Sequence, residues 1–222
     1  MRITRLGPVA ALAVAVVLLS GCGAAQPGVA AEVGQETITI AEVDDLAASI
    51  CDVTEDLPDD NPNAGVRTGE QARNSALQAL ILRSMADQMA ADYGVESGED
   101  FRRQEDRARL GFAASDEAKV EAALPGVTAI AYFVDIMQQI GDTTKSGLSD
   151  DEALTAGIGL AQDWQDDHGV ETNPLFNSFR IGDQEIESER SDLAFAVSGT
   201  AKDAEGGSED YASSLPKSQR CG

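Results

Sequence analysis

Apolar side chains recur at every third or fourth position through most of the chain, which predicts a mainly helical protein. Thr39, Thr68 and Ser149 are each followed three residues later by Glu or Gln, the capping-box pattern of a helix start. We expect a first helix to begin at residue 39. Five further helices are expected at 68–93, 98–111, 116–124, 127–140 and 149–168. The stretch 127–140 is the most apolar, so we expect it to be the central helix.

Helix-breaking residues give the expected ends of these helices. Pro125 and Gly126 are expected to end the fourth helix, and Gly141 the fifth. Between the first two helices, residues 52–65 form a loop with five acidic side chains. Its oxygens could bind calcium, but the spacing of an EF-hand loop is missing, so we favour a solvated acidic loop.

Before the first and after the last predicted helix, apolar residues recur at every second position instead of every 3.6 residues. This change of period predicts a few short strands. Residues 30–38 form one strand or a small hairpin with a turn at Gly34, and residues 170–174 form another that ends at Pro174. Alternation of Leu193, Phe195 and Val197 suggests a third. Residues 198–220 are rich in Gly, Ser and acids, and we expect them to be poorly ordered.

The N-terminal segment has the pattern of an export signal. Arg2 and Arg5 precede an uncharged apolar run at 9–19, which is too short to span a bilayer but has the length of a signal-peptide core. The next residues, Leu-Ser-Gly-Cys at 19–22, resemble a bacterial lipobox. That resemblance implies a signal peptide at 1–21, a lipid on Cys22, a tether at 22–29 and attachment to the outer face of the cytoplasmic membrane. The alternative is an ordinary secretory signal with an incidental cysteine.

The net negative charge of the chain limits the classes of molecule that it is expected to bind. The chain carries a formal charge of −23, and loss of Arg2 and Arg5 with the signal peptide would change this to −25. Such a surface repels nucleic acid and anionic lipid headgroups, so we expect no phosphate-binding function. Aromatic residues make up only 5% of the chain, which favours helices packed through small side chains.

Three cysteines remain to be assigned. If Cys22 carries lipid, Cys51 and Cys221 form an even pair in an oxidising compartment, where a disulfide between them is expected. The alternative is two free thiols. A disulfide would join the first helix to the extreme C-terminus.

Two segments of the chain have a recognisable pattern: A-E-V-G-Q-E-T-I-T-I-A-E-V-D at 31–44 and V-E-T-N-P-L-F at 170–176. They resemble the N-terminal domain of the periplasmic chaperone SurA and of related foldase lipoproteins. The second departs from the family pattern at Thr172, Leu175 and Asn177. The resemblance implies a SurA-N-like helical domain at 30–182 whose first strand pairs with the strand after the last helix. A short strand and an acidic, partly disordered tail would follow at 183–222.

The same resemblance implies that a groove between helices binds exported or unfolded polypeptides. The apolar arc on residues 76–89 is wider than one packing contact needs, and methionines suit a surface that adapts to varied clients. The alternative is that the arc is ordinary core. Candidate groove residues lie on two apolar helices: Leu82, Met85, Met89, Tyr132, Phe133 and Met137.

No catalytic, cofactor or metal motif occurs, which favours a non-enzymatic protein. The single histidine, His168, is expected to cap a helix C-terminus rather than to catalyse. Four arginines on the helix at 98–111 favour an exposed, salt-bridged face over a surface for an acidic partner. Two alternatives to a chaperone stay open: a foldase related to prolyl isomerases, and an accessory lipoprotein with one dedicated envelope partner.

Overall fold

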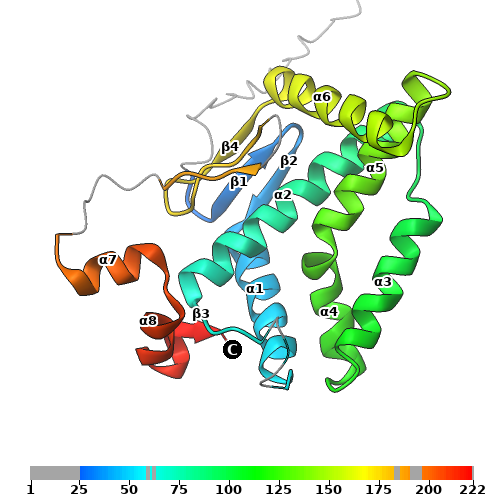
Figure 1. The fold of residues 1–222 in the computed structure, drawn as a ribbon. Helices are drawn as coiled ribbons and strands as arrows, with labels where there is room; N and C mark the ends of the chain where they lie inside the picture. The colour runs from blue at the N-terminus through cyan, green and yellow to red at the C-terminus, as the bar shows by residue number, and fades with distance from the viewer. Residues whose placement is uncertain (1–25, 59–60, 62–63, 183–185, 191–196, 222) are drawn as a thin grey trace, which may run out of the picture.

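A computed structural model describes residues 26–58, 61, 64–182, 186–190 and 197–221. These residues form a mainly helical protein with a few short antiparallel strands, which confirms that part of the predicted fold class (Figure 1). The predicted signal peptide, Cys22 and the first part of the tether lie outside the described residues.

A three-stranded sheet brings the two ends of the helical region together. Strands β1 (Val29–Val33) and β2 (Glu36–Thr39) form the predicted hairpin, and β4 (Val170–Thr172) pairs antiparallel with β1. Ala31 lies opposite Thr172 in this register. The first strand therefore pairs with the strand after the last long helix, as expected.

Six helices form the body of the protein, and all three predicted capping boxes are present at their starts. Their bounds are α1 Ile40–Glu55, α2 Gly69–Tyr93, α3 Glu99–Gly111, α4 Glu117–Val127, α5 Ala129–Thr144 and α6 Asp150–His168. Figure 1 shows α6 along the top of the molecule and α2 and α5 crossing below it.

Two predicted helix ends are wrong. Pro125 lies inside α4, and the chain breaks only at Thr128, where the α4 and α5 axes bend by 50°. The Thr128 hydroxyl donates to the Leu124 carbonyl oxygen at 2.6 Å and so satisfies one terminal acceptor of α4. Gly141 does not end α5, which continues to Thr144. Gly141 instead lies at a helix crossing.

Helices α5 and α6 approach each other through two glycines. A methyl group on Gly141 of α5 would overlap the backbone of Ala153 in α6, and one on Gly157 of α6 would overlap the backbone of Met137 in α5. Only glycine allows so close an approach on both helices. Gly141 therefore serves packing rather than termination.

Helix α2, rather than the predicted 127–140 stretch, lies at the centre of the fold. It contacts α1, α4 and α5 as well as strands β1 and β2. The Gln88 amide also donates to the Val33 carbonyl oxygen at 2.8 Å and so ties α2 to the hairpin. Because α2 has neighbours on several sides, its buried residues extend around most of the helix rather than along one stripe.

The C-terminal region is more regular than expected. Strands β5 (Arg180–Ile181) and β6 (Ile186–Glu187) pair, and helices α7 (Gly199–Gly206) and α8 (Glu209–Ser214) follow. Ser198 and Ser208 cap these two helices. Strand β7 (Arg220–Cys221) then pairs with β3 (Arg67–Thr68). The structure thus places two short helices and a strand in the segment 198–220, where the sequence predicted poor order. Val197 is exposed and outside any strand, whereas Leu193 and Phe195 lie outside the described residues.

Candidate functional site

A disulfide joins Cys51 of α1 to Cys221 of β7, in agreement with the pairing expected from the cysteine count. The two Cα atoms lie 5.0 Å apart although 170 positions separate them in the chain. Cys221 is buried, and Cys51 is half-buried. The bond holds the C-terminal segment against α1 and beside β3.

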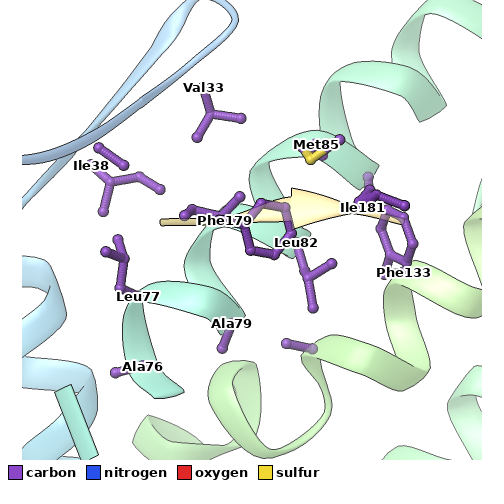
Figure 2. Packing of buried hydrophobic residues seen from close by; sticks show 14 of the residues in the cluster. Val33, Ile38, Ala76, Leu77, Ala79, Leu82, Met85, Phe133, Phe179 and Ile181 are labelled. Carbon is purple, nitrogen blue, oxygen red and sulfur yellow. The ribbon is translucent and has the colours of Figure 1, made fainter. Parts of the chain in front are cut away.

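Most of the predicted groove residues belong to the core. Leu82, Met85, Met89 and Met137 have no exposed surface, and Phe133 is buried as well. Figure 2 shows Leu82 and Met85 among Phe133, Phe179 and Ile181. The arc on residues 76–89 is wide because the sheet and the β5 region cover it on one side and α5 on the other. This burial overturns the assignment of Met85, Met89, Phe133 and Met137 to an open groove. Leu82 has no exposed surface either, although it lies among the residues that line the hollow described below.

Tyr132 differs from the other five candidates because it is only half-buried. Its hydroxyl donates to an Asp87 carboxylate oxygen at 2.5 Å, and its ring packs edge-on against Phe101 and under the Arg83 guanidinium. Partial burial and the Asp87 contact raise the pKa of Tyr132 to about 12. Tyr132 thus fastens α5 to α2 and α3.

An open hollow of about 690 Å³ lies between α1 and α2 on one side and the α3–α4–α5 segment on the other. We call it the open cleft. The described residues that line it are Ile50, Thr54, Leu57, Asn61, Arg67, Ser75, Gln78, Ala79, Leu82, Arg107, Ala108, Gly111, Phe112, Gly126, Val127, Ala129 and Ile130.

Exposed apolar side chains lie within the open cleft. Ile130 is 60% exposed and Val127 is 37% exposed, although both belong to the most apolar stretch of the sequence. The bend at Thr128 turns the start of α5 away from the line of α4. This site could not be found from apolar spacing, because spacing alone does not show that the chain bends at Thr128. The signal that was present is Pro125-Gly126, directly before the exposed pair.

Helix α3 forms the outer wall of the open cleft and is held mainly by polar contacts. Phe101 is its single buried residue, and the Gly98 amide before it donates to Asp135 of α5 at 2.7 Å. Arg109 donates to Glu121 of α4 at 2.9 Å, a contact that lowers the pKa of Glu121 and raises that of Arg109. The exposed, salt-bridged face predicted for this helix is present.

His168 ends α6, as expected, with Gly169 as its C-cap. Its ring stacks on Trp164 with centroids 4.6 Å apart, and Nδ1 lies 3.0 Å from the Trp164 carbonyl oxygen. In the described ranges, no three His, Cys, Asp or Glu side chains are grouped so that they could hold a metal ion. The acidic loop at 52–65 is described only in part.

Among the described helices, none is by itself long and apolar enough to cross a membrane. The bent pair α4–α5 reaches the necessary length and apolarity only when both helices are taken together.

Three comparisons with known proteins found no relative of this chain. No family model, no curated protein and no solved structure matches this chain. The resemblance to the SurA N-terminal domain therefore stays a prediction.

Proposed function

We propose that this chain is a cell-envelope protein, anchored through a lipid on Cys22, that binds apolar segments of other polypeptides without catalysing a reaction. The observation that carries the proposal is the open cleft with Ile130 and Val127 exposed inside it. Its volume of about 690 Å³ falls in the range of ligand-binding pockets, and its lining combines apolar side chains with a few polar groups.

A bound segment would gain free energy by covering these side chains. Complete burial of an isoleucine or valine contributes about 1.5–3 kcal/mol, so a few inserted residues are enough for reversible binding. The open cleft has helices on both sides, as in grooves that receive apolar anchors of a peptide. Reversible binding of this kind suits a chaperone for exported polypeptides.

Site-specific photocrosslinking in native membranes tests the proposal. A photoreactive amino acid at Ile130 of the full-length chain should form adducts with other polypeptides. The same residue at Leu175 is the matched control, because Leu175 is 71% exposed but does not line the open cleft. Equal labelling from both positions would contradict binding at the cleft. Many different adducts would support a chaperone, whereas one stoichiometric adduct would support an accessory subunit.

The proposed anchor has its own test. Metabolic labelling with a fatty-acid analogue should mark the wild-type chain and fail to mark Cys22→Ala. An unlabelled wild-type chain would refute lipidation but would leave the cleft hypothesis to be judged by the crosslinking experiment.

A further inference from the structure

The arginines in the described part of the chain divide into two groups. Eight of the ten interact with a carboxylate, a backbone carbonyl or an aromatic ring through their guanidinium groups. Those eight are Arg73, Arg83, Arg102, Arg103, Arg109, Arg180, Arg190 and Arg220. Arg67 and Arg107 make no such contact with any described residue. Within the described part of this acidic chain, neither of these two guanidinium groups has a partner.

Arg67 and Arg107 both line the open cleft. They reach it from different elements, because Arg67 belongs to β3 and Arg107 to α3. None of the described lining residues is Asp or Glu, although these two types supply 39 of the 222 residues. The open cleft therefore combines exposed apolar side chains with two arginines whose guanidinium groups contact no described carboxylate.

We infer that the segment bound in the open cleft carries an acidic side chain, Asp or Glu, whose carboxylate is held by Arg67 and Arg107. This inference rests on the proposed function and specifies its ligand. Guanidinium groups bind carboxylates through paired N–H donors, and such charge-assisted hydrogen bonds are stronger than neutral ones. The apolar wall at Ile130 and Val127 would receive the neighbouring residues of the same segment.

The disulfide positions one of these arginines. Arg67 lies directly opposite Cys221 in the β3–β7 pair, and Cys221 is bonded to Cys51 of α1. Ile50 and Thr54, on either side of Cys51 in α1, line the same cleft. One covalent link thus fixes the strand that bears Arg67 and the helix that forms the adjacent wall. Such preorganisation lowers the cost of ordering the site when ligand binds.

Three synthetic peptides test the inference with the full-length chain in detergent micelles. Each is a fluorescent apolar nonapeptide: one has a central Glu and blocked ends, one has Gln in its place with blocked ends, and one has Gln and a free C-terminal carboxylate. The wild-type chain should bind the Glu peptide about tenfold more tightly than the blocked Gln peptide. In Arg67→Gln/Arg107→Gln this preference should disappear while binding of the Gln peptide is unchanged. Arg102→Gln is the matched control, because it removes the same charge from α3 outside the cleft lining.

The outcomes separate the two hypotheses. Equal binding of the Glu and Gln peptides to the wild-type chain would overturn the inference and leave the proposed function intact. Tighter binding of the peptide with a free C-terminal carboxylate than of the Glu peptide would also overturn the inference. The two arginines would then hold the C-terminal carboxylate of a chain rather than an acidic side chain. Loss of the preference in Arg102→Gln would attribute it to net charge and overturn the role of the two arginines. Failure of all three peptides to bind would contradict the proposed function itself.

Discussion

The two ends of α5 differ in how far neighbouring elements cover them. In the C-terminal half, Met137 and Gly141 lie against the α6 backbone, and the glycines at this crossing leave no space between the helices. In the N-terminal half, Ala129 and Ile130 face the open cleft, and Ile130 is 60% exposed. Both halves have apolar side chains at helical spacing. Apolar spacing therefore shows which side chains share an apolar helix face but does not show whether another element covers that face.

The α5–α6 crossing and helix α3, the outer wall of the open cleft, also differ in the contacts that hold them in place. The α5–α6 crossing depends on backbone contact, whereas α3 is fixed to its neighbours by Phe101, the Asp135 cap and exposed ion pairs. Surface ion pairs contribute little to stability, and elements with few buried contacts open most readily. The cleft wall is therefore the more adaptable part of the molecule.

The strongest contrast is expected between a charge in the sealed core and the same charge in the cleft. Met85→Asp buries a carboxylate at a side chain with no exposed surface, so we expect a loss of more than about 4 kcal/mol and an unfolded chain at moderate temperature. Ile130→Asp places the carboxylate in solvent and should leave the melting curve nearly unchanged. A folded, stable Met85→Asp variant would mean that the arc on residues 76–89 opens to solvent.

Loss of the disulfide should lower global stability and act most strongly on the cleft side. Cys51→Ala removes a link across 170 positions, and we expect a loss of about 2–4 kcal/mol with a melting temperature lower by several degrees. Hydrogen exchange should become faster throughout the core, and the increase should be largest in β3 and at the end of α1 and smaller in α6. Free alkylation of both cysteines in the unreduced wild-type chain would show that the bond does not form.

The sealed crossing can be tested with two neighbouring glycines of α6. A methyl group at Gly157 overlaps the α5 backbone, so Gly157→Ala should cost about 1–3 kcal/mol. Gly159 has no atom within 4 Å of an added methyl group, and Gly159→Ala should stabilise the helix by about 0.5–1 kcal/mol. Thermal unfolding of both variants measures the difference. Equal effects of the two substitutions would contradict the close approach of α5 and α6.

Features that depend on local chemistry were predictable from the sequence. The capping boxes at Thr39, Thr68 and Ser149 use side chains three residues apart, and the turn at Gly34 needs a positive φ that glycine supplies. The cysteine pair was predictable because two of the three thiols remain once Cys22 is assigned to the expected lipid anchor. Each of these inferences depends on residues close in sequence or on a simple count.

Features that depend on tertiary contacts were not predictable. Gly141 was expected to end a helix because its contact with Ala153 of another helix has no sequence pattern of its own. The groove was assigned to Met85 and Met89 because their stripe is wide, although that width results from neighbours on several sides. The exposed Ile130 follows the bend at Thr128, whose angle depends on packing.

The smallest expected effect concerns the ion pair that fastens the cleft wall. Arg109 lowers the pKa of Glu121 from its ordinary value of 4.5, so the ionised carboxylate stabilises the folded state above that pH. This contribution is lost as the pH falls through the folded-state pKa of Glu121. Glu121→Gln should therefore be slightly less stable than the wild type near neutral pH, and the difference should vanish well below pH 4.5.

Carboxyl NMR titration measures the same contact directly. The Glu121 midpoint should lie below 4.5 in the wild-type chain and return toward 4.5 in Arg109→Gln. Met85 and the α5–α6 crossing should be unaffected by this titration, because the pair joins only α3 and α4. An unshifted Glu121 midpoint in the wild type would mean that α3 is held by the packing of Phe101 and Ala108 and by the Asp135 cap, without this ion pair. Helix α3 would then have one contact fewer, and the difference between its weak attachment and the close α5–α6 crossing would be larger still.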